Sequence, residues 1–168
     1  MKSSGRLILT KPVKKDLTRF YEINADPETN LFNPNGPMNF ETAEKAFSEM
    51  TEHWKINGFG SWSIREKENP DYIIGFGGLA DRLYGNETKL NLGYRFDKKY
   101  WGKGYATELA QHAIAYGFNE LNKKEIFAIV RPTHLVSVKV LEKCHMKLFD
   151  ELNDVQNAEN SLIYKIEK

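Results

Sequence analysis

Two glycines and two lysines lie close together in the second half of the sequence, at Lys99, Gly102, Lys103 and Gly104, between a stretch with strand character and one with helical character. Glycine adopts positive φ angles without steric cost and lets a ligand approach the main chain. The free N–H groups of a first helical turn, aided by the helix dipole, bind phosphate oxygens. These residues therefore predict an anion site with added positive charge.

The spacing differs from two familiar phosphate-binding loops. A dinucleotide-binding fingerprint needs a third glycine about two residues beyond Ala106, an acidic residue about twenty further on and a β-α-β start. A P-loop needs Lys and then Ser or Thr after its second glycine, whereas Gly104 is followed by Tyr105. Neither fits, and a nucleotide-binding domain is kept only as a hypothesis that affinity for NAD or ATP would support.

Apolar periodicity predicts the elements that hold this loop. A first helix is capped by Asp16 and ended by Pro27, and a second begins near Asn39 and ends at Asn57. Two more helices are predicted over 104–118, with Glu108 and His112 facing outward, and over 135–143. Strands are predicted over 6–10, 60–65, 72–79, 89–96, 126–130, 147–150 and 161–166. The order β-α-α-β-β-β-α-β-α-β-β indicates an α+β fold.

The composition bounds the class of protein. The chain has 168 residues, of which 40% are hydrophobic and 28% charged, and we expect one domain over residues 1–168. With 24 Lys plus Arg against 23 Asp plus Glu, no overall charge favours nucleic acid or an anionic membrane. The first apolar run is too short for a signal peptide or a membrane helix. The lone Cys144 agrees with a reducing compartment, so we expect a cytoplasmic protein.

The histidines and the cysteine give no metal pattern. His53, His112, His134 and His145 show no ligand spacing, and one cysteine supports no zinc site. Cys144 and His145 are adjacent, but neighbours at a helix end do not face each other. A buried, unreactive thiol is therefore favoured over a nucleophile, and no metal is expected.

Several segments together resemble the GNAT N-acetyltransferase superfamily, in particular its branch of ribosomal-protein N-terminal acetyltransferases and related small-molecule enzymes. The resemblance implies a splayed, mixed but mostly antiparallel sheet of six to seven strands, flanked by about four helices, and acetyl-CoA as co-substrate. The segments that carry it are Arg6–Leu9, Gly75–Leu79, Leu92–Tyr94, Tyr100–Glu108 and Ser137–Lys143.

The resemblance also implies which residues bind the cofactor. The strand end is expected to receive the pantetheine arm as an added strand, and the glycine loop to hold the pyrophosphate, mainly through backbone donors. A second cofactor segment follows at the start of helix 135–143. The expected cofactor-binding residues are Tyr94, Arg95, Phe96, Lys99, Gly102, Lys103, Gly104, Tyr105, Ala106, Thr107, His134 and Ser137.

Direct acetyl transfer needs an unprotonated amine, a donor for the developing oxyanion and a proton for the departing thiolate. By resemblance, the Tyr94 backbone N–H is the expected oxyanion donor and the Ser137 hydroxyl the candidate general acid. Ser137 as an ordinary helix cap is the alternative. His134 stands at the family's usual Asn, and it is kept as a cofactor contact or, alternatively, a base.

The general base is left unassigned, because Asn91 occupies the position of the family's frequent Glu. Glu87, Asp81, His53 or a chain of waters is the alternative. An α-amine with a pKa near ~8 is partly unprotonated at neutral pH, whereas a Lys side chain near ~10.4 is not. The absence of a carboxylate base at position 91 therefore favours weakly basic amines as acceptors.

The acceptor is expected to be a primary amine, either a protein N-terminal α-amine or a small-molecule amine. By resemblance, the helix face of Phe40, Phe47 and Trp54, together with Phe32 and the loop 33–37, borders the acceptor site, although a plain core face is favoured for Phe47 and Trp54. The loop is the better candidate for specificity, because Pro and Gly place it on the surface. A catalytically inactive acyl-CoA-binding module of the same fold is the alternative function. The assembly is expected to be a monomer or a homodimer.

Overall fold

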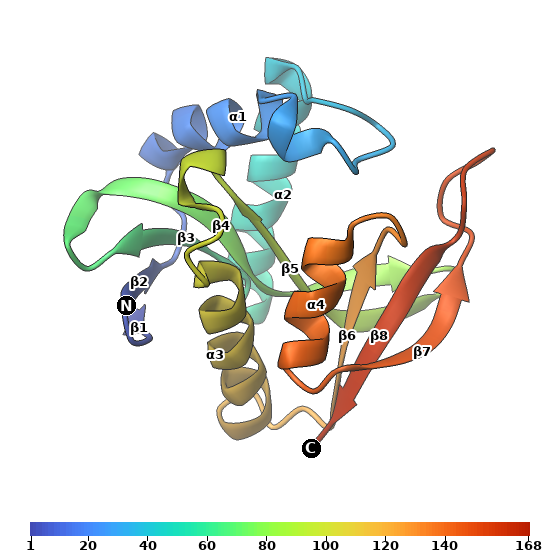
Figure 1. Cartoon of the computed structure of the whole chain (residues 1–168). Helices are drawn as coiled ribbons and strands as arrows, with labels where there is room; N and C mark the ends of the chain where they lie inside the picture. Colours follow the sequence, from blue (N-terminus) through green and yellow to red (C-terminus); the bar gives the residue numbers. More distant parts are fainter.

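The computed structural model describes residues 1–168, and eight strands form one sheet in the order β1-β2-β3-β4-β5-β6-β8-β7. In Figure 1, β1, β2 and β3 lie in the left part of the sheet and β6, β8 and β7 in the right part, while β4 and β5 run between the two. The strands are β1 (Lys2–Ser3), β2 (Leu7–Thr10), β3 (Ser61–Glu66), β4 (Asn69–Tyr84), β5 (Glu87–Phe96), β6 (Glu125–Val130), β7 (Lys147–Leu152) and β8 (Ser161–Glu167).

The sheet divides between β5 and β6. On one side, β5 pairs with β4 antiparallel over ten residue pairs, from Gly75↔Phe96 to Tyr84↔Glu87. On the other side, β5 runs parallel to β6 and is paired with it only at Asn91↔Phe127. The last residues of β5 therefore have a strand on one side and a free edge on the other.

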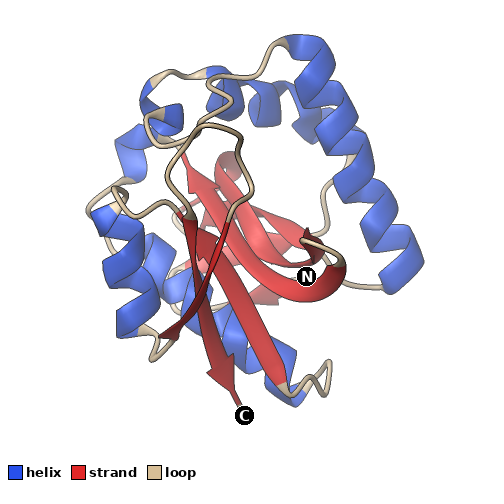
Figure 2. Ribbon diagram, turned by 90° about the vertical axis from the view of Figure 1, so that its right-hand side faces the viewer, coloured by secondary structure: helices blue, strands red, loops and turns tan.

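Four helices cover the two faces of the sheet, as Figure 2 shows. The helices α1 (Leu17–Ala25) and α2 (Phe40–Asn57) contact each other, and α1 packs on β4 and β5. The helices α3 (Tyr105–Asn119) and α4 (Leu135–Lys143) also contact each other and lie against β4, β5 and β6.

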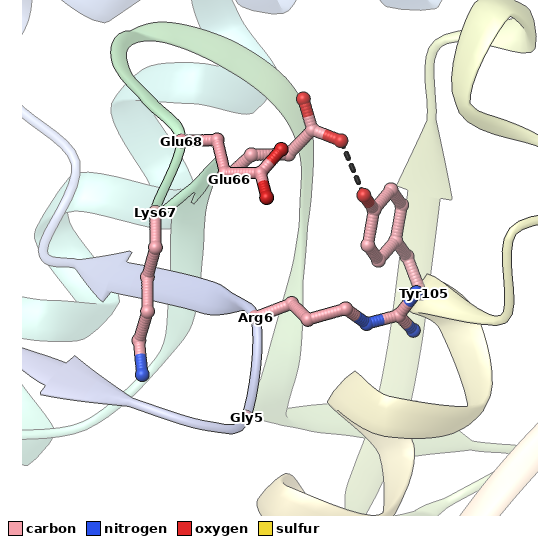
Figure 3. A pocket seen from close by; sticks show the side chains of 6 residues that line it. All are labelled: Gly5, Arg6, Glu66, Lys67, Glu68 and Tyr105. Atoms are coloured by element: carbon pink, nitrogen blue, oxygen red, sulfur yellow. Dashed lines mark hydrogen bonds between the residues drawn. The ribbon is translucent and has the colours of Figure 1, made fainter.

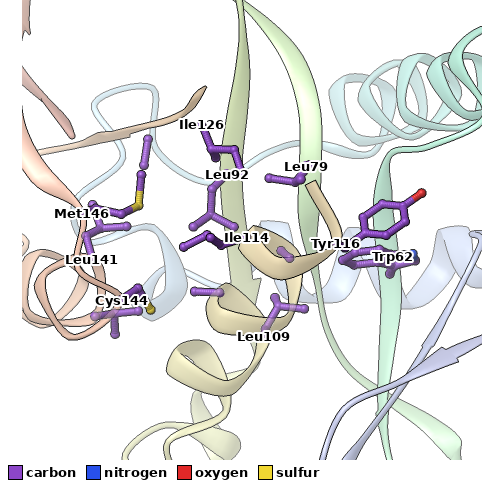
Figure 4. Packing of buried hydrophobic residues seen from close by; sticks show 14 of the residues in the cluster. Trp62, Leu79, Leu92, Leu109, Ile114, Tyr116, Ile126, Leu141, Cys144 and Met146 are labelled. Atoms are coloured by element: carbon purple, nitrogen blue, oxygen red, sulfur yellow. The ribbon is translucent and has the colours of Figure 1, made fainter. Parts of the chain in front are cut away.

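The main hydrophobic core lies beneath α3 and α4. Leu79, Leu92 and Ile126 project from the strands to meet Leu109 and Ile114 of α3, as Figure 4 shows. All five are buried, so the position of α3 is set by close packing on the strands that flank the division of the sheet. A smaller cluster beneath α1 and α2 contains Phe20, Ile23, Ala43, Phe47, Ile73 and Phe76.

The predicted α+β class and the mostly antiparallel, splayed sheet with four helices are confirmed. The expected count of six to seven strands is wrong by the addition of β1, a two-residue strand at Lys2–Ser3 that is too short to show a periodic pattern. The second helix begins and ends as predicted, because the Asn39 side chain caps the Thr42 N–H and Gly58 adopts φ 73°.

Two residues of α3 do not face outward as predicted. The side chain of Glu108 is only 17% exposed and accepts hydrogen bonds from Ser4 and Arg6 near the start of the chain, while the ring of His112 lies 5.8 Å from that of Trp62. The N-terminal segment covers Glu108, and Trp62 of β3 lies against His112. Helical periodicity alone reveals neither contact. None of the helices is long and apolar enough to cross a bilayer.

Candidate active site

The end of β5 presents main-chain groups along its free edge. The Asp97 N–H donates to the Ile74 carbonyl across the β4–β5 pair, at 2.9 Å. Because successive residues of a strand turn their polar groups in opposite directions, Arg95 turns its main-chain groups toward β4, while Tyr94 and Phe96 turn theirs away from it. The Phe96 carbonyl accepts a hydrogen bond from the Trp101 indole, at 3.0 Å. The Tyr94 N–H and C=O and the Phe96 N–H thus face the gap beside β6.

The loop that follows β5 presents a second set of main-chain donors. Gly102 and Gly104 adopt φ angles of 73° and 81°, in the left-handed region that glycine favours. Gly104 is the N-cap of α3, and no side chain caps the helix there. The N–H groups of Tyr105, Ala106 and Thr107 therefore have no acceptor within the chain, and they form the kind of helix start that binds phosphate.

Positive charge surrounds these donors. Lys99, Lys103 and both loop glycines are exposed. The Lys103 ammonium lies 4.8 Å from the centre of the Tyr100 ring, and Lys99 makes no ion pair, its main-chain N–H donating to the Asp97 carboxylate at 2.9 Å. Burial acts to raise the pKa of Asp97, but the Lys99 N–H and the neighbouring Arg19 outweigh it and hold the pKa below its ordinary value. Asp97 is therefore a carboxylate at neutral pH, and it holds the start of the loop by accepting the Lys99 N–H.

Arg6 fixes the other end of the loop. Its guanidinium donates to the Lys103 carbonyl at 2.9 Å and to Glu108 at 2.8 Å, and it lies over the ring of Tyr105, 4.5 Å from the centroid. Burial acts to raise the pKa of Glu108, but hydrogen bonds from Arg6 and Ser4 lower it overall. These contacts hold the first turn of α3 in place from outside the loop.

A pocket of about 210 Å³ lies beside this anchor, lined by Gly5, Arg6, Glu66, Lys67, Glu68 and Tyr105. In Figure 3, Arg6 reaches toward Tyr105, whose hydroxyl donates to Glu66. The pocket is lined by two acidic side chains, Glu66 and Glu68, and two basic ones, Arg6 and Lys67, so it has no net charge of either sign. We assign it a supporting role for the start of α3.

The start of α4 approaches the free edge of β5 from the side of β6. His134 is the N-cap residue of α4, and its side chain makes no capping bond. The Ser137 hydroxyl lies 3.3 Å from His134 Nε2 and beside the phenol of Tyr94. Ser137 is the third residue of the helix, so its interpretation as an ordinary N-cap is wrong.

The Tyr94 side chain is a polar group that sequence analysis did not single out. Burial raises the pKa of its phenol to about 12; the Ser137 hydroxyl acts against this rise and Cys144 adds to it. The phenol is therefore protonated at neutral pH and can donate a hydrogen bond. Next to it, burial and then the positive charge of Arg95 lower the pKa of His134, so that its ring is neutral at pH 7.

On the opposite face of β5, Arg95 meets the connection between α1 and α2. Its guanidinium donates to the Asn30 side-chain oxygen, and Asn30 itself is buried, its amide nitrogen donating to the Asn24 and Asp26 carbonyls at 2.8 Å. Phe32 stacks on His134, with ring centres 4.2 Å apart and planes at 11°. The α1–α2 connection, light blue in Figure 1, thus reaches the start of α4.

Comparison with known proteins identifies this arrangement. A family model described as an acetyltransferase (GNAT) domain matches residues 6–147. The chain belongs to the GNAT acetyltransferase family. It is an N-acetyltransferase of the acyltransferase class, a family that uses acetyl-CoA.

Relatives agree over most of the length of this GNAT chain. It is 30% identical over 145 residues to the uncharacterized N-acetyltransferase YnaD of Bacillus subtilis, covering 86% of this chain and 81% of that protein. A GNAT-family acetyltransferase from Bacillus anthracis superposes with a TM-score of 0.79 at 25% identity, covering 98% and 96% of the two chains. Spermidine N-acetyltransferase from Vibrio cholerae, solved with CoA and spermine, has a TM-score of 0.76 at 18% identity over 96% and 95%, and shows the fold alone.

The position of the family's frequent Glu is closed in this GNAT protein. Asn91 is buried, and its side-chain oxygen accepts from the Tyr84 hydroxyl at 2.7 Å. Asn91 therefore links two strands of the sheet and does not face the free edge of β5.

The other candidate bases are engaged elsewhere. Glu87 is exposed at the far end of the β4–β5 hairpin and pairs with Lys89 at 2.6 Å. His53 Nδ1 lies 2.9 Å from the Phe59 carbonyl, and its Nε2 accepts from the Asp81 N–H at 3.1 Å, so both ring nitrogens hold main chain.

Cys144 and His145 have structural positions. Cys144 is buried, and burial raises the pKa of its thiol to about 11. His145 adopts a φ of 62° directly after α4, at a position where the family has Gly. No three His, Cys, Asp or Glu side chains come together in a way that would hold a metal ion.

Proposed function

We propose that this GNAT protein transfers the acetyl group of acetyl-CoA to a primary amine by direct attack within a ternary complex. The single observation that carries the proposal is the free edge of β5, which runs directly into a loop with an uncapped helix start. An extended pantetheine arm can pair with the edge as an added strand while a diphosphate meets the amides.

In this proposal, each part of the cofactor meets a different part of the chain. Tyr94 and Phe96 receive the pantetheine arm through the main-chain groups that face the gap, while Arg95 between them pairs with β4 and holds the strand in place. Trp101 limits the pairing because it already bonds the Phe96 carbonyl. His134 and Ser137 contact the thioester end from α4. The pyrophosphate lies on Lys99, Gly102, Lys103, Gly104, Tyr105, Ala106 and Thr107.

The chemical step follows from these positions. The amine nitrogen attacks the thioester carbonyl carbon, and the Tyr94 N–H, which points into the gap, donates to the resulting oxyanion. The C–S bond then breaks, and the thiolate takes a proton from the Ser137 hydroxyl. The nitrogen loses its extra proton, which passes directly or through water to the Ser137 oxygen, leaving CoA, an acetamide and the serine in its starting form. The neutral Tyr94 phenol lies beside Ser137, where it can support this proton transfer.

No carboxylate takes the role of general base in this proposal. Asn91 is bonded to Tyr84, His53 is held by the Phe59 and Asp81 main chain, and the Asp81 carboxylate lies 3.4 Å from His53 Nε2. The favoured acceptor is therefore an amine with a low pKa, which is partly unprotonated before it binds. We therefore assign the chain to the ribosomal-protein N-terminal acetyltransferase branch or to its small-molecule relatives. We further propose that it is a single-domain cytoplasmic protein and a monomer or a homodimer.

The test combines binding with turnover. Acetyl-CoA is expected to raise the melting temperature where NAD and ATP do not, since a ligand held at 100 times its Kd stabilises the folded state by about 2.7 kcal/mol. Thiol release and product mass are then measured with N-terminal peptides, polyamines and aminoglycosides. A shift with no thiol release from any amine would favour the inactive acyl-CoA-binding module, and a shift with NAD or ATP alone would overturn both.

A further inference from the structure

Arg95 differs from every other arginine of the chain. Arg6, Arg19, Arg65, Arg82 and Arg131 each have a side-chain carboxylate within 4.0 Å. Arg95 has none, although it is less exposed to water than Arg6 or Arg82. Its side-chain partner is the neutral amide of Asn30. Leaving a half-buried cation without a counter-charge costs free energy, so an unpaired guanidinium at a binding site points to a negatively charged ligand.

The groups around Arg95 supply no negative charge of their own. The Asn30 side chain is locked, because its nitrogen donates to two main-chain carbonyls and its oxygen also accepts from Asn33 at 2.9 Å. His134, whose pKa is lowered by burial and by the charge of Arg95, is neutral at pH 7 and stacks on Phe32. Asn30 therefore orients the guanidinium and leaves its charge uncompensated.

Exposed apolar side chains follow in sequence the two residues that interact with this charge, Asn30 and His134. Leu31 and Phe32 follow Asn30 in sequence, and Leu135 and Val136 follow His134; Leu31 is 68% exposed and Val136 71% exposed. Exposed apolar side chains gathered beside a polar centre are typical of a ligand-binding surface. The stacking of Phe32 on His134 places one of these apolar side chains, from the α1–α2 connection, directly against the start of α4.

We propose that Arg95 binds a carboxylate of the amine acceptor, so that the substrate is an amine that carries both a carboxylate and an apolar group, as an apolar amino acid does, and not a polyamine. The inference rests on the proposed function, because it concerns the acceptor side of that same site. It adds a role for the Arg95 side chain, which lies on the face of β5 opposite the Tyr94 side chain. The positive charge also disfavours a protonated amine beside it, which suits a site without a carboxylate base.

The test uses product-like probes that differ by one charge. N-acetyl-L-leucine and N-acetyl-L-leucinamide are titrated into the protein saturated with CoA, and binding is measured by calorimetry. The acid is expected to bind at least about tenfold more tightly than the amide, since a charge-assisted bond contributes roughly 1.4 kcal/mol or more. Arg95→Gln should remove this preference and leave CoA affinity unchanged. Arg82→Gln, at an exposed arginine, should keep both.

The outcomes separate the two proposals. Absence of CoA binding to the unaltered protein contradicts the proposed function, whereas this inference is judged by the contrast between acid and amide. Equal affinity for the two probes, binding of neither, or a preference that survives Arg95→Gln would overturn it. So would a loss of CoA affinity in Arg95→Gln, which would assign the guanidinium to the cofactor, or efficient acetylation of spermidine with no acetylation of L-leucine.

Discussion

The cofactor side and the acceptor side of the candidate site are built in different ways. The diphosphate part of the cofactor side is one continuous segment, Lys99 to Thr107, whose donors are main-chain N–H groups made available by Gly102 and Gly104. The acceptor side is assembled from the α1–α2 connection, β5 and the start of α4, and its central groups are the side chains of Arg95 and His134.

Because of this difference, substitutions on the two sides of the site are expected to have different effects. Backbone donors depend on the path of the chain, so many side chains can be exchanged in the loop while its diphosphate geometry is kept. Side-chain donors depend on residue identity, so one substitution at Asn30 or Arg95 alters what the acceptor side recognises. Variants on the acceptor side are therefore expected to change turnover or acceptor affinity, and variants of the loop to change CoA affinity.

Ser137→Ala should give the largest effect on turnover. Removing the proposed proton donor is expected to lower kcat about 100-fold, while the Kd for CoA changes less than about threefold, because the hydroxyl contributes little to binding the ground state. Steady-state kinetics and calorimetry give the two values. Ser48→Ala, an exposed serine of α2, is the control and should match the unaltered enzyme; a Ser137→Ala enzyme with normal kcat removes Ser137 from the chemistry.

Gly104→Val should weaken CoA binding about 10- to 100-fold. A β-branched residue at a φ of 81° is strained by roughly 1–3 kcal/mol, and relief of that strain would move the amides that meet the diphosphate. Gly85→Val is a matched control, since Gly85 has a φ of 60° in the remote β4–β5 turn. It should lose comparable stability and keep CoA affinity. Unchanged CoA affinity in a folded Gly104→Val protein contradicts the assigned diphosphate site.

Arg6→Ala should weaken CoA binding about 3- to 10-fold, because the Lys103 carbonyl and Glu108 lose the donor that fixes the first turn of α3. Because the pKa of Glu108 is lower in the folded state than in the unfolded state, its ionisation stabilises the fold when the pH is above the unfolded-state pKa. This contribution is lost as the pH falls through the folded-state pKa. Without Arg6, that pKa rises toward its ordinary value. Acid unfolding, followed by circular dichroism, should therefore begin at a higher pH than in Arg82→Ala.

Cys144→Ala should leave kcat within about twofold of the unaltered enzyme, since Cys144 has no place in the proposed transfer. With a thiol pKa of about 11 and no exposure, Cys144 should react with a disulfide reagent at pH 8 only after unfolding. Rapid labelling of the folded protein, with parallel loss of activity, would place this cysteine in the site after all.

Sequence analysis reached the fold and the loop because both depend on local signals. The period of apolar residues predicts the strands and helices, and Gly102 and Gly104 indicate a turn that few other residues permit. It did not reveal the orientation of Glu108, which depends on Ser4 and Arg6 bonding α3, or the added β1, which depends on a two-residue pairing with β2.

The acceptor side was reached only in part. Phe32 and its loop were predicted to border it, but the bond between Asn30 and Arg95 joins residues 65 positions apart, which no local pattern reports. For Arg95 the resemblance implied only a main-chain role. The nearby Asn24, Asn30 and Asn33 are a usable signal, since amide side chains in a short connection often bond main chain and so mark an ordered segment.

Tyr94 and Arg95 are consecutive residues of β5, and their side chains project from opposite faces of the sheet. Covalent geometry fixes their Cα atoms about 3.8 Å apart. The residue proposed to contact the thioester, Tyr94, and the residue proposed to contact the acceptor, Arg95, are thus joined by a single peptide unit. A movement of the α1–α2 connection would change how readily an acceptor enters the site. It would not change the distance between the thioester and the acceptor, because both are positioned by the same strand.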